Sequence, residues 1–172
     1  MNATARPTES SSVPRLIVRT DGAARGNPGP AAAGAVLIDA ATPAALDPRA
    51  RPLLELSEAL GTTTNNVAEY IALLLALDAA EGFGAREIEL LLDSKLIVEQ
   101  LHGRFRVRDA KLIPLHREAV TRLGRFARWS ARHVPRAQNR AADALANAAL
   151  DRKATPSERV RRWLPAGLFD PR

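Results

Sequence analysis

Apolar residues along this chain follow two spacings, and these spacings divide the sequence into strands and helices. Short apolar runs bounded by glycine, proline or polar clusters predict five strands, at residues 15–20, 33–38, 53–60, 86–92 and 128–134. Apolar residues at helical spacing predict four helices, at residues 67–81, 94–101, 114–126 and 138–150. The order is three strands, a helix, a strand, two helices, a strand and a helix, which is typical of an α/β fold with a mixed sheet.

Local signals agree with these elements. Residues 62–66, Thr-Thr-Thr-Asn-Asn, offer capping side chains for the helix predicted at 67–81, which ends before Gly82. The strand predicted at 86–92 is apolar apart from Arg86 and two glutamates, which indicates a central position in the sheet. Residues 39–52 contain three prolines and predict a long hairpin connection.

The length of the chain is typical of one domain. It has 172 residues, of which 46% are hydrophobic, enough to bury a core. We assign residues 15–150 to that domain, the Ser/Thr/Pro-rich residues 1–14 to a disordered leader, and residues 151–172 to a C-terminal extension that docks on the body or on a partner. No apolar run approaches the roughly 18 residues of a membrane span, and residues 1–14 lack the apolar stretch of a signal peptide. We therefore expect no membrane attachment.

The net charge and the cysteine content exclude only a few classes of function. The net charge of +6 suits a polyanionic partner such as nucleic acid, although a solvated basic surface explains it equally well. The absence of cysteine excludes disulfides, thiolate catalysis and cysteine-ligated zinc. It fits a reducing interior, and we expect a cytoplasmic monomer.

Four acidic residues each lie inside a short polar signature next to a predicted element. They are Asp21 after the first strand, Glu69 in the first helix, Asp93 after the fourth strand and Asp143 in the last helix. Carboxylates gathered at strand ends and helix starts form an oxygen-rich site that suits Mg²⁺ or Mn²⁺. Each acid alone is explained as a helix cap or a solvated side chain. A cluster of four would be unfavourable without a cation, because like charges repel, so the set favours a metal site.

These signatures, in this order, resemble those of type 1 ribonuclease H from about residue 16 to residue 150. They read Asp21-Gly22-Ala23-Ala24-Arg25-Gly26-Asn27-Pro28-Gly29-Pro30, Thr64-Asn65-Asn66-Val67-Ala68-Glu69, Asp93-Ser94 and Asn139-Arg140-Ala141-Ala142-Asp143. The resemblance implies a ribonuclease H-like fold, with a five-stranded mixed sheet of three antiparallel and two parallel strands flanked by helices. It also implies an endoribonuclease that hydrolyses the RNA strand of RNA–DNA hybrids by a two-metal mechanism, with two Mg²⁺ ions that Mn²⁺ can replace.

The same resemblance implies roles for individual residues. Asp21 would bridge both metal ions, Glu69 and Asp93 would complete one of them, and Asp143 would complete the other. The residues expected to contact the hybrid backbone are Gly22, Asn27, Thr64, Asn65 and Asn66. The 2′-OH would distinguish the RNA strand, and double-stranded RNA is a further candidate partner. For the glycine-rich segment, an ordinary hairpin connection is the alternative.

Two features depart from the best-known members of that family. Many members carry a histidine in a long loop before the last aspartate, whereas this chain has a short loop containing Arg136. We expect Arg136 to meet the scissile phosphate, a solvated arginine being the alternative, and His133 to be packed or hydrogen-bonded at the end of its strand. The segment at 100–114 is too short for the basic helical protrusion of many members, so the chain resembles a short form. Its own basic residues would replace part of that grip or form a solvated edge.

Two other functions use the same residues. A catalytically weak module that binds RNA–DNA hybrid or double-stranded RNA would keep the fold but would not need all four acids. A related four-acid nuclease, such as a 3′–5′ exonuclease or a junction resolvase, would use a similar sheet. Exonucleases of that group usually carry Asp-x-Glu on the first strand, whereas Asp21 is followed by Gly22 and Ala23. The leading prediction is therefore a ribonuclease H.

Overall fold

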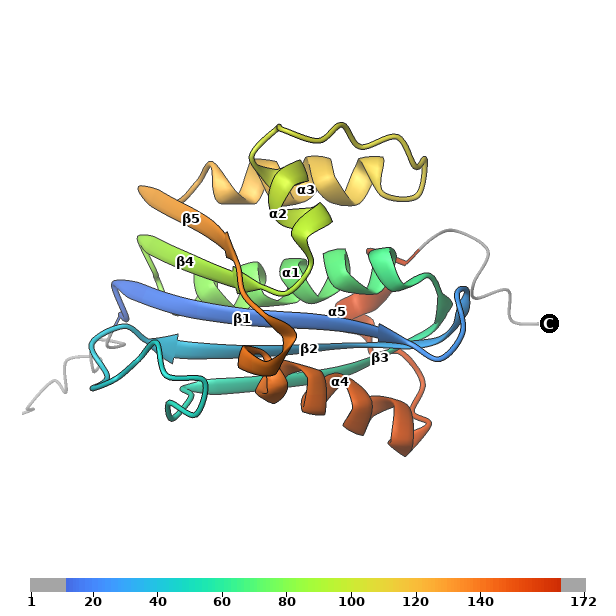
Figure 1. The fold of residues 1–172 in the computed structure, drawn as a ribbon, viewed down its shortest axis with the longest axis horizontal. Helices are drawn as coiled ribbons and strands as arrows, with labels where there is room; N and C mark the ends of the chain where they lie inside the picture. Colours follow the sequence, from blue (N-terminus) through green and yellow to red (C-terminus); the bar gives the residue numbers. More distant parts are fainter. Residues whose placement is uncertain (1–11, 165–172) are drawn as a thin grey trace, which may run out of the picture.

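A computed structural model of the chain describes residues 12–164 as one five-stranded sheet with helices on both faces (Figure 1). The strands are β1 (Arg15–Ala24), β2 (Gly29–Asp39), β3 (Leu54–Thr63), β4 (Glu87–Leu92) and β5 (Arg128–His133). The helices are α1 (Asn65–Gly82), α2 (Lys95–Leu101), α3 (Ile113–Leu123), the 3-10 turn η1 (Arg136–Gln138), α4 (Arg140–Arg152) and α5 (Glu158–Arg161).

The sheet has the strand order β3-β2-β1-β4-β5. β1 pairs antiparallel with β2 and β2 with β3, whereas β1 and β4, and β4 and β5, are parallel. The predicted sheet of three antiparallel and two parallel strands is thus confirmed. β4, expected in a central position, pairs with β1 on one side and β5 on the other, while β1 is the middle strand of the five.

The first two strands are longer than the sequence pattern predicts. The ladder between β1 and β2 continues past Asp21 as far as the pair Ala24 and Ala31. The apolar pattern stops earlier, because this part of the hairpin consists of small and polar residues. The candidate acid on β1 therefore lies inside a paired strand and not in a loop.

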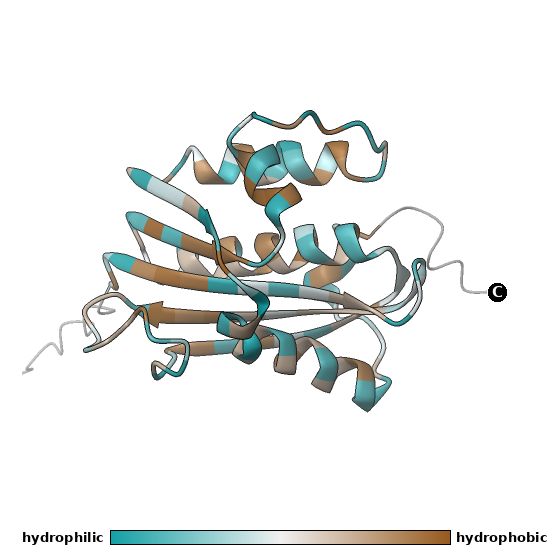
Figure 2. Ribbon diagram, in the orientation of Figure 1, coloured by the Kyte–Doolittle hydropathy of each residue, from teal (hydrophilic) through white to brown (hydrophobic). Residues whose placement is uncertain are grey.

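Helices cover both faces of the sheet, and hydrophobic residues run along β1, β2 and β4 between them (Figure 2). Leu16 and Val18 of β1 pack in the same core cluster as α1, whereas Ile17 packs in a smaller cluster with Val134 and Leu145. Such alternation follows from the period of two along a strand. α1 is buried on nearly all sides because α3 lies on its outer surface, so its apolar residues extend beyond a single stripe.

Two glycines let helices lie directly against the sheet. A Cβ atom at Gly22 of β1 would be 2.2 Å from the backbone nitrogen of Glu69 in α1. A Cβ atom at Gly34 of β2 would be 2.2 Å from the carbonyl oxygen of Ala142 in α4. Any larger residue would move the helix. Both glycines therefore set the position of a helix that carries a candidate acid.

The chain outside the predicted domain is only partly described. Most of the predicted leader, residues 1–14, lies outside the described residues, but the Val13 N–H donates to the Phe83 carbonyl oxygen at 3.1 Å. In the C-terminal extension, Trp163 is buried and its Nε1 donates to Glu118 Oε1 at 3.0 Å. The described part of the extension therefore docks on the body, while residues 165–172 lie outside the described range. Within residues 12–164 no helix has the length and apolar character needed to cross a bilayer.

Candidate active site

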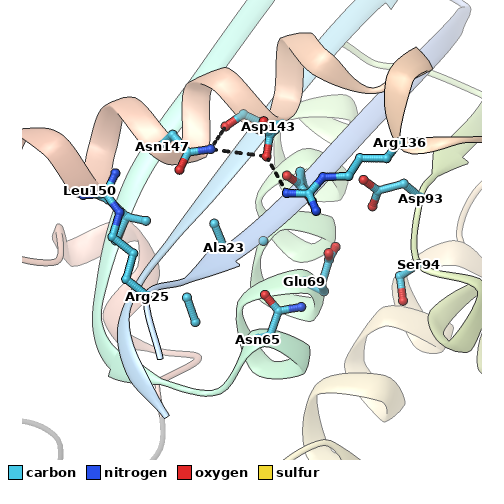
Figure 3. A pocket seen from close by; sticks show the side chains of 13 residues that line it. Ala23, Arg25, Asn65, Glu69, Asp93, Ser94, Arg136, Asp143, Asn147 and Leu150 are labelled. Carbon is cyan, nitrogen blue, oxygen red and sulfur yellow. Dashed lines mark hydrogen bonds and ion pairs between the residues drawn. The ribbon is translucent and has the colours of Figure 1, made fainter. Parts of the chain in front are cut away.

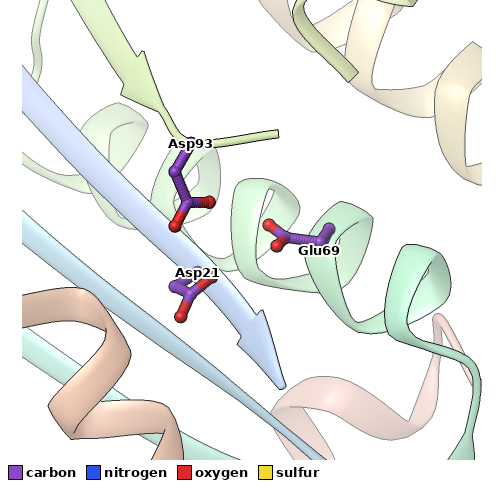
Figure 4. A group of neighbouring side chains, drawn as sticks. All are labelled: Asp21, Glu69 and Asp93. Atoms are coloured by element: carbon purple, nitrogen blue, oxygen red, sulfur yellow. The ribbon is translucent and has the colours of Figure 1, made fainter. Parts of the chain in front are cut away.

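The four predicted acids come from four different elements and line one pocket. Asp21 lies on β1, Glu69 on α1, Asp93 directly after β4, and Asp143 on α4. Asp21, Glu69 and Asp93 each offer a carboxylate oxygen, and these oxygens lie within 4.8 Å of one another (Figure 4). Asp143 lines the same pocket and interacts with the carboxyl group of Asp21, whose pKa it raises.

The fold explains why these side chains converge. β1 and β4 are parallel neighbours whose last pair is Thr20 and Leu92, so the next residue of each chain segment, Asp21 or Asp93, lies at the same edge of the sheet. On α1, the Thr64 hydroxyl accepts a hydrogen bond from the Val67 N–H at 3.3 Å and fixes the start of the helix. Glu69 then faces the sheet in the second turn, where Gly22 leaves room for it.

Burial and mutual repulsion raise the pKa values of Asp21, Glu69 and Asp93. Burial, followed by the charge of Asp93, raises the pKa of Asp21 to about 7. Burial, followed by the charge of Asp21, raises the pKa of Glu69 well above its usual value. Burial also raises the pKa of Asp93, although a hydrogen bond with Asn139 and the charge of Arg136 oppose this. In the absence of a cation, the cluster therefore holds protons at neutral pH.

This donor set fits a hard divalent cation. Among residues 12–164, Asp21, Glu69 and Asp93 are the only group of three or more possible ligands from His, Cys, Asp or Glu that lie this close together. All of the donors are carboxylate oxygens, which Mg²⁺ and Mn²⁺ prefer, and none is a soft sulfur ligand. The pocket lined by these acids has a volume of about 480 Å³, and Figure 3 shows the side chains around it.

The raised pKa values predict how pH changes the stability of the metal-free protein. A carboxyl group with a folded-state pKa above its unfolded value stabilises the fold when protonated, so stability falls as pH rises from about 3.8 to about 7, the two values for Asp21. In EDTA at pH 8, Glu69→Gln should therefore raise the melting temperature by about 3–6 °C, and at pH 4 by much less. Differential scanning fluorimetry measures this, and equal melting temperatures at pH 8 would contradict it.

Arg136 reaches across the pocket toward Asp143 (Figure 3). It lies in η1, its guanidinium nitrogen is 3.6 Å from Asp143 Oδ1, and 81% of its side chain is exposed. The expected contact of Arg136 with a scissile phosphate stays a prediction, although its exposure leaves the side chain free to change partners. His133 lies at the end of β5, and its ring Nε2 is 3.2 Å from the Asp93 carbonyl oxygen, which agrees with the expected hydrogen bond at the strand end.

The residues predicted to hold the substrate lie in and around the same pocket. Gly22 and Asn65 line it, and the Asn65 N–H donates to Asn27 Oδ1 at 3.1 Å, which fixes the hairpin loop against the start of α1. Thr64 and Asn66 are next to Asn65 but do not line the pocket, and the Thr64 hydroxyl caps α1. The absence of a side chain at Gly22 has a structural reason, since α1 fills that space.

Three further polar residues belong to this site and have no role in the predictions above. Asn147 of α4 donates to both Asp143 Oδ1 and the Asp143 carbonyl oxygen, at 3.2 and 3.0 Å. Asn147 lies four residues after Asp143 on a predicted helix, and this spacing could have predicted that the two side chains are neighbours. Arg25 and Ser94 also line the pocket. Each lies inside one of the four signatures, but the sequence gives no reason to assign it more than the loop or helix cap that it forms.

Comparison with known proteins places this geometry among solved nucleases. Residues 19–149 match a family model described as reverse transcriptase-like. The chain is 47% identical over 137 residues to ribonuclease HI of Halobacterium salinarum and 43% identical over 137 residues to the bifunctional protein Rv2228c of Mycobacterium tuberculosis. Both matches cover 80% of this chain, but only 65% and 36% of those relatives, respectively.

Solved structures of RNase H1 proteins are also similar to this chain. The crystal structure of RNase H1 from H. salinarum has a TM-score of 0.73 at 45% identity, covering 80% of this chain and 98% of that one. LC11-RNase H1, isolated from compost and solved in complex with an RNA/DNA hybrid, has a TM-score of 0.71 at 37% identity, covering 80% and 97%.

Proposed function

This chain belongs to the ribonuclease H family, and we propose that it is a divalent-metal-dependent endoribonuclease that hydrolyses the RNA strand of RNA–DNA hybrids. The observation that carries the proposal is the convergence of the Asp21, Glu69 and Asp93 carboxylates within 4.8 Å, with Asp143 beside them. The hybrid bound to LC11-RNase H1 supports the substrate. The chain matches only 36% and 65% of the lengths of the M. tuberculosis and H. salinarum relatives, respectively. The activity and the substrate are therefore proposed for this chain and not taken over from the relatives.

We assign the four acids to two Mg²⁺ ions, for which Mn²⁺ can substitute. Asp21, at the centre of the group, would hold both ions, while Glu69 and Asp93 would hold one and Asp143 the other. Two such ions supply an activated water and neutralise charge on the phosphate and the leaving oxygen. The protein's own contribution is to keep four carboxylates on rigid elements, close together and ionised when the ions are present.

We propose that the polar residues beside the acids hold the hybrid backbone. Asn65 and Gly22 line the pocket, and the start of α1 lies beside it, where the positive end of the helix dipole favours phosphate. Asn27, Thr64 and Asn66 would extend this contact surface. Such contacts read phosphate, sugar and shape, so we expect little dependence on base sequence.

Arg136 would contact the phosphate at the cleavage point. Its guanidinium lies 3.6 Å from Asp143 in the absence of substrate, and a phosphate would offer it a stronger bidentate partner. A monomer is sufficient in this proposal, because one chain supplies all four acids. We place its action in the cytoplasm, where hybrids from replication primers and transcription would be its substrates.

Removal of the metal should abolish activity. We expect a labelled RNA–DNA hybrid to be cut in the RNA strand with Mg²⁺ or Mn²⁺, with no detectable cutting in EDTA, because the acids alone cannot activate water or neutralise the phosphate. Denaturing gel electrophoresis of the labelled strands measures this.

Double-stranded RNA and double-stranded DNA of the same sequence serve as controls in the same assay. Cleavage of the RNA duplex would widen the substrate class, and cleavage of DNA would favour a different four-acid nuclease. Binding of the hybrid without cleavage under either metal would contradict the proposal and favour a binding module.

A further inference from the structure

Asn139 contacts three of the four elements that carry the acids. It lies between η1 and α4, is fully buried, and its Nδ2 donates to the Thr20 carbonyl oxygen of β1 at 2.8 Å. Its side chain also interacts with the carboxyl group of Asp93, which follows β4, and lowers the pKa of that group. Its backbone carbonyl oxygen accepts from the Asp143 N–H at 3.2 Å, in the first turn of α4.

The orientation of this amide is determined by its neighbours. The Thr20 carbonyl oxygen can only accept a hydrogen bond, so the NH₂ group of Asn139 must face it. The Oδ1 atom is buried and has no partner among the described residues. The Asn139 side chain therefore acts through its NH₂ donors, because its buried acceptor has no partner and is itself unfavourable. Thr20 also belongs to the last pair of the β1–β4 ladder, and Asn139 supplies a donor where that pairing ends.

Two simpler roles do not fit these contacts. Asn139 occupies the position before the first residue of α4, but its side chain makes no capping hydrogen bond to that helix. It is fully buried and so does not reach a substrate in the pocket. The turn before it is held separately by Arg19, whose guanidinium donates to the Gln138 carbonyl oxygen at 2.8 Å. Loss of the Asn139 side chain should therefore leave the turn in place.

We propose that Asn139 is a positioning residue that holds β1, the end of β4 and the start of α4 together, so that Asp21, Asp93 and Asp143 present their carboxylates to the same metal ions. This inference rests on the proposed function. Polar groups that orient metal ligands typically contribute a factor of about 10–100 to metal affinity or activity. Because Asn139 does not touch the substrate, its loss should change kcat and metal affinity but not KM.

The test compares wild type with Asn139→Ala and Asn139→Ser. Isothermal titration calorimetry with Mn²⁺ measures metal affinity without any reaction, and steady-state cleavage of the hybrid gives kcat and KM. For Asn139→Ala we expect Mn²⁺ affinity and kcat each to fall about 10–100-fold, with KM within about threefold of wild type. Asn139→Ser keeps a donor near Thr20 and should recover part of both losses.

Gln100→Ala is the matched control, because Gln100 is also buried and accepts a hydrogen bond from Tyr70 Oη at 2.7 Å. It should lower the melting temperature without changing Mn²⁺ affinity. Folded Asn139 variants with wild-type Mn²⁺ affinity and kcat would overturn the inference, as would failure of both variants to fold, which would assign Asn139 to folding alone. If wild type itself neither binds Mn²⁺ nor cleaves the hybrid, the proposed function fails instead.

Discussion

Replacement of Asp21 by asparagine is expected to lower the rate of hybrid cleavage by at least about 10³-fold while the protein stays folded. The substitution keeps the shape of the side chain but removes its negative charge and one ligand oxygen. Asp21 is the most central of the acids, since its carboxyl group interacts with those of Glu69, Asp93 and Asp143.

The metal-free fold should tolerate this change. Burial and neighbouring charges raise the pKa of Asp21 to about 7, so its charged form is the unfavourable one when no cation is present. A neutral asparagine removes that cost, and the variant should melt at or above the wild-type temperature in EDTA at pH 8. Loss of activity together with retained stability would separate a role in chemistry from a role in folding.

Single-turnover cleavage of a labelled hybrid, with saturating Mg²⁺, measures the effect. Asp39→Asn is the matched control, because Asp39 lies at the opposite end of the same β1–β2 ladder, where it pairs with Leu16. That control should cleave at the wild-type rate. Residual activity of Asp21→Asn within about tenfold of wild type would contradict the central position that we assign to Asp21.

Much of this site is visible in the sequence because its parts are local. Asp21 and Asp93 each adjoin an apolar strand, and parallel strands bring their carboxyl ends to one edge of a sheet. Glu69 and Asp143 lie in strong helix signals with polar residues at their starts. The strand pattern and the four signatures therefore predict both the mixed sheet and the group of acids.

The remaining features depend on contacts between distant residues, which no local pattern encodes. The bond from Asn139 to Thr20 joins residues 119 positions apart, and the sequence offers no reason to choose that donor from among its polar neighbours. Arg136 reads equally as a phosphate ligand or a solvated side chain, and its pairing with Asp143 becomes visible only with α4 in place. Likewise, the apolar residues of the C-terminal extension do not indicate whether it docks on the body or on a partner. The hydrogen bond from Trp163 to Glu118 shows that its described part docks on the body.

The sequence also does not show that helices approach the sheet closely at Gly22 and Gly34. Gly22 lies in a segment whose composition also fits a flexible loop or a contact with nucleic acid. Gly34 lies within a predicted strand, where it would be expected only to weaken the strand. In the structure, α1 packs against Gly22 and α4 packs against Gly34. Gly34 is also the cross-strand partner of Asp21. The position of α4 relative to the central acid is therefore set at Gly34.

Gly34→Ala should accordingly be one of the most damaging small substitutions in this protein, with a loss of about 3 kcal/mol or more in the free energy of unfolding. The added Cβ would lie 2.2 Å from the Ala142 carbonyl oxygen and 2.7 Å from the Ala146 nitrogen. Both are backbone atoms, so no side-chain rotation can relieve the contact, and α4 must move away from the sheet. Because Asp143 lies between these two residues, the movement would also displace it from Asp21.

Urea denaturation in EDTA measures the stability loss, and Mn²⁺ titration at a temperature where the variant remains folded measures the displacement of Asp143. Gly82→Ala is the matched control, since a Cβ at the end of α1 meets nothing within 4 Å. The free energy of unfolding of that variant should equal the wild-type value or exceed it by up to about 1 kcal/mol, because alanine favours a helix more than glycine does. If Gly34→Ala were as stable as Gly82→Ala and bound Mn²⁺ equally well, α4 would not be held against β2 at this point, and the site could not depend on that contact.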